Sequence, residues 1–391
     1  MTAPRNSLTT LSLVGFLAWL SYEMVRSPVL PLFAKDLGIS PAAIGFVVGA
    51  STITGIFLKF PAGVLSDLIP RRRLLLVGAA AFGLGPFGYL VIDDPGTLIA
   101  FRFLHGMATA VFAPVALAVI ASWHTERRAE SLSWYSSATM AGGLLGPVLG
   151  GILMQHAGFP ITFLTAGLFG LAALGVVVGL RFPEPHVEQH PRGAAWREIR
   201  TRMVRAAREG AGDPRILITS GMQGAQYMAL GVLQAFLPLY GLAVGLDATR
   251  VGILFGVQVL MTVLSKPMLG RLSDRIGRKP LILAGLGVSA AAIAGIPAAG
   301  SFGGLLGIST GFGLGVALVT SSVPALVADF CRERHYGSAM GLFGTLMDVG
   351  HASGPVVGGL LIARFGYPTA FLAAAGILIL AALLFAAKVK T

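Results

Sequence analysis

Six ionisable residues interrupt long apolar stretches of this chain. They are Glu23, Arg26, Arg102, His105, Asp348 and His351. A charged side chain is costly in hydrocarbon, so such residues are candidates for substrate binding or proton transfer. A carboxylate whose surroundings alternate between apolar burial and a nearby cation changes its pKa, and it can therefore take up and release a proton.

Two interpretations of these groups compete. In the functional one, Glu23 accepts a coupling proton, Arg102 lowers its pKa, and Asp348 is a second protonation or substrate-contact site. In the structural one, Glu23 is permanently paired with Arg26 or Arg102. Asp348 would then pair with His351, one turn away on the same helix face, or with a backbone group. With both histidines neutral, the two acids and two arginines sum to zero, which disfavours a site devoted to cations.

A further polar face lies in the seventh apolar stretch. Gln223, Tyr227 and Gln234 fall at i, i+4 and i+11, on one side of a helix, and Gln226 is close by. This face predicts either a hydrogen-bonding wall of a cavity or polar packing between helices. The residues assigned to a substrate cavity are Arg26, His105, Gln223, Tyr227, Gln234 and His351.

The elements that carry these residues are membrane helices. The 391 residues are 55% hydrophobic and 12% charged, with a mean hydropathy of +0.79, whereas soluble domains are about 25% charged. This composition excludes a soluble domain and a disordered chain, and the lone Cys331 excludes a disulfide scaffold. Twelve stretches approach the length of about 20 residues that a spanning helix needs. They are 8–33, 41–62, 73–92, 97–121, 132–155, 159–180, 216–240, 249–269, 280–299, 302–328, 338–362 and 366–387.

The basic residues indicate how the chain is oriented. The net charge of +12 is spread over short connectors, so it predicts no nucleic-acid partner. Successive connectors lie on alternate sides of the membrane. Those on one side hold 22 Lys and Arg, and those on the other side hold only Lys35, Arg250 and Arg364. By the positive-inside rule, both termini are cytoplasmic. We expect a multi-pass protein of the cell inner (cytoplasmic) membrane.

The two halves of the chain repeat each other. Lys59 and Gly63-Val64-Leu65-Ser66-Asp67 return 207 residues later as Lys266 and Gly270-Arg271-Leu272-Ser273-Asp274. The pattern Gly142-x3-Gly146-Pro147-x2-Gly150-Gly151 returns 208 residues later from Gly350 to Gly359. The repeat predicts an all-α integral membrane fold of twelve transmembrane helices in two pseudo-symmetric six-helix bundles. The domains are 1–180, a cytoplasmic linker at 181–215, and 216–391, with a solvated connector or an amphipathic helix at 194–209.

These motifs resemble the major facilitator superfamily of transporters over the whole chain. The family's loop motif after helix two is present as Gly63, Leu65, Asp67, Arg71 and Arg72, with Pro70 in place of glycine, and its second copy is complete. The glycine-proline motif of helix five is typical of the drug/proton antiporter branch. The family places helices one and four along the central cavity, which implies that Glu23, Arg26, Arg102 and His105 could form one cluster.

The resemblance also implies two gates. The cytoplasmic gate consists of Gly63, Asp67, Arg71, Arg72, Gly270, Asp274, Gly277, Arg278 and Lys279, unless these residues serve only topology and lipid contact. The helix-packing gate on the outer side consists of Gly142, Gly146, Pro147, Gly150, Gly151, Gly350, Gly354, Pro355, Gly358 and Gly359. Glycines four apart let helices approach closely, so ordinary packing is the alternative for this second set.

No phosphate-binding loop, catalytic triad or metal-ligand spacing is present, so we expect neither an enzyme nor a cofactor. The sequence predicts a monomeric secondary transporter that works by alternating access. Its partners would be protons, a small-molecule substrate and the lipid bilayer, and its activity proton-coupled export of amphiphilic or drug-like molecules. The alternatives are an exporter or flippase of a sugar, metabolite or lipid-linked substrate, or a non-transporting membrane sensor.

Overall fold

The computed structural model describes residues 7–123, 127–180, 201, 213–330 and 336–389, and their regular secondary structure is helical. The first half contains α1 (Ser7–Met24), η1 (Val25–Val29), α2 (Leu30–Asp36), α3 (Pro41–Leu68), α4 (Arg71–Gly88), η2 (Tyr89–Val91), α5 (Pro95–Trp123) and α6 (Arg128–Gly179). The second half contains α8 (Pro214–Ala243), α9 (Ala248–Ile276), α10 (Arg278–Gly295), η3 (Ile296–Ala298), α11 (Phe302–Phe330), α12 (Tyr336–Phe365) and α13 (Tyr367–Lys388). Most of the predicted linker, including the expected amphipathic helix, lies outside the described residues.

These helices confirm the predicted fold class. Ten segments are long and apolar enough to cross a membrane, and α6 is one of them although it contains two predicted helices. Its chain reverses at Gly158, where φ is +78°. The eleventh helix is therefore the second part of α6. The twelfth is α8, whose glutamines lower its mean hydropathy. Gly366, with φ +82°, makes the equivalent turn between α12 and α13.

The predicted first helix is broken near its far end. Within residues 8–33, the backbone leaves the helical region at Ser27 (φ −146°, ψ 129°), directly before Pro28. Proline lacks an N–H group and clashes with the preceding turn, so it accounts for the kink. The break lies one turn beyond Glu23 and changes the direction of the chain between α1 and α2.

Acidic and hydroxyl side chains fix several helix starts. Ser40 and Asp247 accept hydrogen bonds from the backbone N–H groups of Ala43 and Arg250, at 3.4 and 2.7 Å. Asp213 caps α8, and the hydrogen bond from the Arg215 side chain lowers the pKa of its carboxyl group. The α8 cap therefore stays ionised at and below neutral pH.

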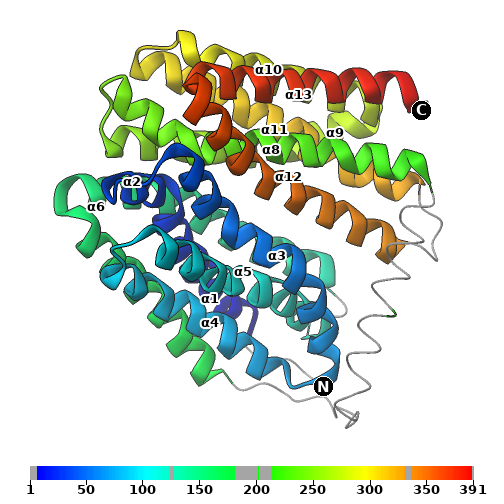
Figure 1. Cartoon of the computed structure of the whole chain (residues 1–391). Helices are drawn as coiled ribbons and strands as arrows, with labels where there is room; N and C mark the ends of the chain where they lie inside the picture. Colours follow the sequence, from blue (N-terminus) through cyan, green and yellow to red (C-terminus); the bar gives the residue numbers. More distant parts are fainter. Residues whose placement is uncertain (1–6, 124–126, 181–200, 202–212, 331–335, 390–391) are drawn as a thin grey trace.

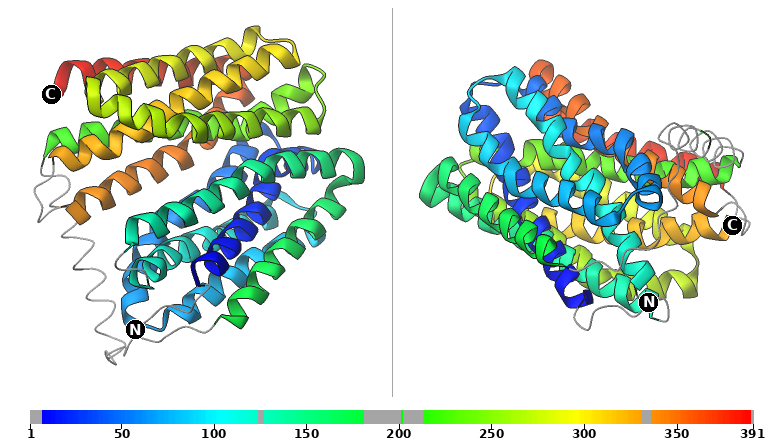
Figure 2. Two further views of the ribbon diagram at one scale, coloured as in Figure 1. Left: turned by 180° about the vertical axis from the view of Figure 1, so that it is seen from behind. Right: turned by 90° about the horizontal axis from the view of Figure 1, so that it is seen from below.

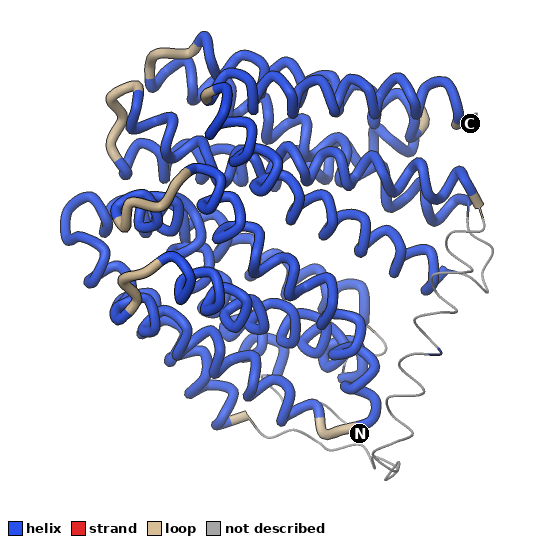
Figure 3. Tube along the Cα trace, viewed as in Figure 1, coloured by secondary structure: helices blue, strands red, loops and turns tan. Residues whose placement is uncertain are grey.

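The helices form two groups that lie side by side (Figures 1 and 2). In the first group α1 packs along α6, and in the second α8 packs along α12. Between the groups, α3 packs on α12 and α6 packs on α9. The loops at the ends of the helices are short (Figure 3). The expected division into two pseudo-symmetric bundles is therefore present in the arrangement of the helices.

The two bundles are packed together at one end and separate at the other. At the end that holds α2, a Cβ atom at Gly45 or Gly252 would meet the carbonyl oxygen of Pro355 or Pro147 of the opposite bundle. At the opposite end, which we call the linker end, the helices of the two bundles diverge (Figures 1 and 2), and Gly270 and Gly341 have no heavy atom near the position of a Cβ. The buried apolar side chains form two clusters. One cluster joins the two bundles, and the other lies within the first bundle alone.

Candidate functional site

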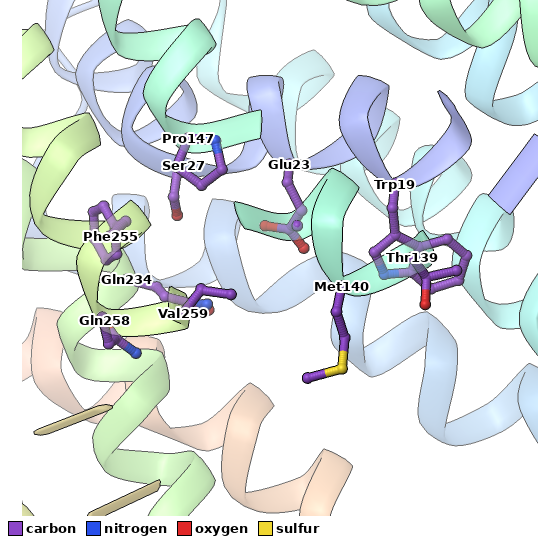
Figure 4. Close-up of a pocket in the computed structure, with 11 residues that line it drawn as sticks. Trp19, Glu23, Ser27, Thr139, Met140, Pro147, Gln234, Phe255, Gln258 and Val259 are labelled. Carbon is purple, nitrogen blue, oxygen red and sulfur yellow. The ribbon is translucent and has the colours of Figure 1, made fainter. Parts of the chain in front are cut away.

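A cavity of about 210 Å³ lies between the bundles around Glu23. Figure 4 shows the Glu23 carboxylate in the space between side chains of the two bundles. The first bundle contributes Trp19, Glu23, Ser27, Thr139, Met140, Gly143 and Pro147, and the second contributes Gln234, Phe255, Gln258 and Val259. One carboxylate in a mostly apolar cavity is an arrangement suited to proton exchange.

A series of close polar contacts leads from Glu23 into the second bundle, and His351 Nε2 can either accept from Arg26 or donate to Gln234. Arg26 lies one turn from Glu23 on the same helix, and its guanidinium donates to the Glu23 carboxylate at 3.3 Å. The Arg26 guanidinium also lies 2.9 Å from Nε2 of His351, which is 2.9 Å from Oε1 of Gln234. The side chains of Glu23 and Arg26 are only 15% and 12% exposed. The bundles are therefore joined by a buried polar network that begins at an acid.

Other residues of the predicted polar wall lie in different surroundings. The Tyr227 ring packs edge-on against His351, with centroids 5.4 Å apart, so it belongs to this network. Gln223 and Gln226 are buried, and Oε1 of Gln223 and both amide atoms of Gln226 have no hydrogen-bond partner in the described part of the chain. Of the predicted polar face in the seventh stretch, Gln234 lines the Glu23 cavity, and Tyr227 lies behind it against His351.

Arg102 and His105 lie inside the first bundle. Arg102 is fully buried and donates to the Val47 carbonyl, the Tyr89 hydroxyl and the Ser51 hydroxyl at 3.3, 3.1 and 2.6 Å. His105 Nδ1 lies 2.8 Å from the same Tyr89 hydroxyl. The expected cluster of four is therefore divided. The Tyr22 ring lies between its two parts, 5.9 Å from the guanidinium of Arg102 and from that of Arg26.

The structural interpretation expected Asp348 to pair with His351 or with a backbone group, and the structure shows a different partner. Asp348 accepts from Lys59 on α3, with Nζ 2.8 and 2.7 Å from the two carboxylate oxygens. The side chains are 38% and 7% exposed, and they line a groove of about 250 Å³ between α3 and α12. This is the ion pair that joins the two bundles in the described part of the chain. The sequence signal was available, because Lys59 interrupts an apolar stretch.

Two lysines correct the expected charge balance. Lys59 and its repeat Lys266 both lie within membrane-spanning helices. Counted together with Glu23, Asp348, Arg26 and Arg102, they change the sum of these intramembrane charges from zero to a positive value.

The glycines of the helix-packing motif face two different neighbours. In α6, Gly142, Gly146 and Gly150 lie against the backbone of α1, where a Cβ atom would meet Phe16, Glu23 or Met24. In α12, Gly350 and Gly354 lie against Gly224 and Met228 of α8 in the same way. Gly151 and Gly359 instead face the other bundle, against Ala248 and Pro41. The motif therefore packs the helices within each bundle, and it brings the two bundles into contact at the end that holds α2.

We expect Gly354→Val to prevent stable folding. Its Cβ would lie against the Met228 carbonyl group and 3.2 Å from the Met228 Cα, so α8 and α12 would have to separate. Overpacking of this kind costs about 3 kcal/mol. The yield of monodisperse protein in detergent should fall at least tenfold. Gly344→Val is the matched control on the same helix, since its Cβ meets nothing within 4 Å; equal yields of the two variants would contradict the packing role.

The loop motif of the first bundle fastens helix ends together. Arg71 donates to the Ala118 carbonyl and to the Ser122 hydroxyl at the end of α5, at 3.2 and 2.7 Å. Arg72 donates to the Val178 carbonyl at the end of α6, at 3.1 Å. Cations placed at exposed carbonyl groups stabilise helix C-termini. The surroundings of Gly63 and the side chain of Asp67 lie outside what the structure describes.

The second copy repeats this arrangement with an added ion pair. Arg278 pairs with Asp274 and also with Asp329 at the end of α11, at 3.1 Å for the latter. Lys279 donates to the Ala386 and Val389 carbonyls at the end of α13, at 3.0 and 2.5 Å. Gly277 precedes α10 with φ +96°, a value that Pro70 cannot adopt. In this conformation the described contacts of both copies stay within their own bundle.

Comparison with known proteins places the chain in a family. The model of the Major Facilitator Superfamily matches residues 11–244 and again residues 219–391. This chain belongs to the major facilitator superfamily. The double match also reflects the internal repeat of its two bundles.

The superfamily relatives include transporters of several kinds. Multidrug resistance protein 1 of Bacillus subtilis is 25% identical over 372 residues, which cover 92% of this chain and 91% of that protein. An MFS-type transporter of Methanocaldococcus jannaschii is 22% identical over 91% of this chain and 89% of its own length. Among solved structures, a bacterial homolog of the human lysosomal transporter Spinster, in an inward-facing conformation, superimposes with a TM-score of 0.82. It is 15% identical and covers 97% of this chain and 95% of its own. The nucleoside transporter NupG gives 0.80 at 14% identity, with 98% and 99% covered.

Proposed function

We propose that this superfamily member is a secondary transporter that exports small amphiphilic molecules in exchange for protons. The observation that carries this proposal is the network from Glu23 through Arg26 to His351 and Gln234. It joins an acid to both bundles at the wall of an inter-bundle cavity. The similarity to Multidrug resistance protein 1 supports the choice of substrate class.

The network couples protonation to movement of the bundles. While Glu23 is ionised, it holds Arg26 on α1, and Arg26 in turn contacts His351 on α12. A proton on Glu23 removes the charge that attracts Arg26, so the guanidinium is free to change its contacts across the bundle boundary. Substrate binding and proton binding then favour different arrangements of the same two bundles, which is the condition for exchange.

The orientation is part of the same proposal. The linker end, where the connectors rich in Lys and Arg lie, faces the cytoplasm, so both termini are cytoplasmic and the protein resides in the cell inner membrane. Because the bundles separate at this end (Figure 1), the proposed orientation makes this conformation inward-facing. We assign 1–180 and 216–391 as the moving domains and 181–215 as their linker, in a monomer.

Two other functions stay as alternatives. The fold is shared with a nucleoside transporter, and a cavity lined by Glu23, Gln234 and Gln258 suits a polar metabolite, a sugar or a lipid-linked substrate. A non-transporting membrane sensor is the alternative from another class, and it would bind ligand without moving protons.

The deciding experiment uses purified protein in liposomes that contain a pH-sensitive dye. A pH gradient is imposed, and lipophilic cations, anions, neutral amphiphiles, nucleosides and sugars are added one at a time. Proton flux that depends on an amphiphile supports the proposal and names the substrate. Flux with sugars or nucleosides alone would establish the polar-metabolite alternative. Binding without flux or substrate uptake would favour the sensor.

A further inference from the structure

Lys266 is a cation within the membrane-spanning part of α9, and it has no partner among the described residues. It is half-buried, and it has no hydrogen bond or ion pair within the described chain. Gly252, Val259 and Lys266 are spaced seven residues apart, so they share one face of α9. Gly252 on this face contacts Pro147 of the first bundle, and Val259 lines the Glu23 cavity. Lys266 therefore lies toward the other bundle, about 10 Å along α9 from the cavity wall.

The internal repeat shows what this lysine lacks. Its counterpart Lys59 occupies the same position on α3 and pairs with Asp348 on α12. The position in the first bundle that repeats Asp348 is Met140 on α6, which lines the Glu23 cavity. The α3–α12 boundary thus carries a neutralised pair, and the α6–α9 boundary carries an uncompensated cation. An unpaired charge in such a place is costly, and an anion would relieve the cost.

The other intramembrane charges named above are already engaged. Glu23 accepts a hydrogen bond from Arg26, and Asp348 accepts hydrogen bonds from Lys59. Arg102 is satisfied by three neutral oxygen atoms inside the first bundle. Of these intramembrane charges, Lys266 is therefore the one without a partner in the part of the chain that the structure describes.

The same side of the molecule has room for an apolar tail. A groove of about 570 Å³ is lined by Ser12 of α1 and by Trp134 and Ala138 of α6. Ser12, Trp19 and Glu23 fall at i, i+7 and i+11, so the groove and the Glu23 cavity follow one face of α1. This groove lies toward the start of α1 and α6, the end at which the bundles separate.

From these observations we propose that Lys266 binds the acidic head group of the substrate, and that the substrates are amphiphiles carrying a carboxylate or phosphate group. The proposal rests on the transport function proposed above and specifies its substrate class. The ammonium group of Lys266 donates charge-assisted hydrogen bonds to the acid, while the tail lies along the α1–α6 groove. The acid comes either from a free small molecule or from a lipid head group.

The test is a binding measurement that needs neither transport nor protons. Protein in phosphatidylcholine nanodiscs is titrated with tritiated octanoate, with empty discs as background. Unlabelled octyl phosphate, 1-octanol and octylamine, which share the tail, compete. We expect the two acids to bind about tenfold more tightly than octanol and octylamine, the scale of one charge-assisted hydrogen bond. Lys266→Met should remove this preference and leave octanol binding unchanged.

Two variants and a second lipid complete the design. Lys266→Arg should keep octanoate binding within about threefold of wild type, and Lys35→Met, at an exposed site on α2, should have no effect. Phosphatidylglycerol in the discs should weaken octanoate binding in a Lys266-dependent way if a lipid head group is the natural occupant, and not if a free acid is. No octanoate binding, tighter binding of octylamine, or an unchanged preference in Lys266→Met would overturn the proposal. Acid-selective binding without proton flux would instead refute only the proposed coupling.

Discussion

Glu23→Gln is expected to abolish substrate-driven proton movement, with a fall of at least 100-fold in proteoliposomes. Glutamine can still accept the hydrogen bond from Arg26, so the contact at 3.3 Å is preserved while the exchangeable proton is lost. Substrate binding should stay within about threefold of wild type, because the shape of the cavity does not change. The measurement is proton flux with the pH dye, alongside ligand binding on the same preparation.

The matched control for this variant is Glu130→Gln. Glu130 is an exposed acid in the first turn of α6, outside the cavity, and its loss should leave proton flux unchanged. If the Glu23 variant still accumulates substrate against its gradient, then Glu23 is not the coupling acid. If flux is lost in Asp348→Asn and retained in Glu23→Gln, the coupling role moves to the pair with Lys59.

Reversing either charge of the Lys59–Asp348 pair should slow transport at least tenfold, and reversing both should restore it. Lys59→Asp places two carboxylates at the α3–α12 boundary, and Asp348→Lys places two ammonium groups there. Like charges at this distance repel, and a shift of about 1.4 kcal/mol between the two bundle arrangements changes their ratio tenfold. The double variant restores opposite charges and should recover to within about threefold of wild type.

A structural readout separates this effect from general damage. In a Cys331→Ser background, Gly341→Cys places one thiol beside the groove of the pair, at a position with no neighbour within 4 Å. The single reversals should slow its labelling about threefold by disfavouring the state that is open at the linker end. Arg250→Asp is the control, because its pair with Asp247 at 3.6 Å is exposed. Unchanged labelling and transport in the single variants would show that the Lys59–Asp348 pair does not stabilise either arrangement of the two bundles.

The two cross-bundle contacts have different physical roles. The Glu23–Arg26–His351 network includes an acid that can change charge and two groups that can change partners. In the Lys59–Asp348 pair, both carboxylate oxygens lie within 2.8 Å of one ammonium group, so the contact is bidentate and joins α3 directly to α12. We therefore expect the first contact to follow protonation and the second to follow the position of the bundles.

Much of the fold follows from local properties of the chain. The length of each apolar stretch, set by the thickness of a bilayer, predicts the helices, and proline and glycine positions predict their ends. Gly158-x-Pro160 is repeated as Gly366-x-Pro368, and both glycines have positive φ where one helix turns into the next. The break at Ser27 within residues 8–33 was not predicted, although Pro28 is a visible signal for it.

The candidate site was only partly predictable, because pairing depends on how helices are rotated and tilted against one another. The sequence identified Glu23, Arg26, Arg102, His105, Asp348 and His351 as ionisable groups inside spans, since hydrocarbon makes any such residue conspicuous. It determined neither that Arg26 contacts His351 across the boundary nor that Arg102 is enclosed by Ser51 and Tyr89. It also left Lys59 without a role.

The sequence by itself determined that this protein is a twelve-helix membrane bundle with an internal repeat, because apolar length and repeated motifs are properties of the chain alone. Only the tertiary structure decided which charges meet. An ion pair between α3 and α12 joins residues 289 positions apart, and no local periodicity encodes such a contact. Among the described residues, the same packing placed a partner opposite Lys59 and none opposite Lys266, because the repeated backbone brings equivalent positions together whatever side chains they carry.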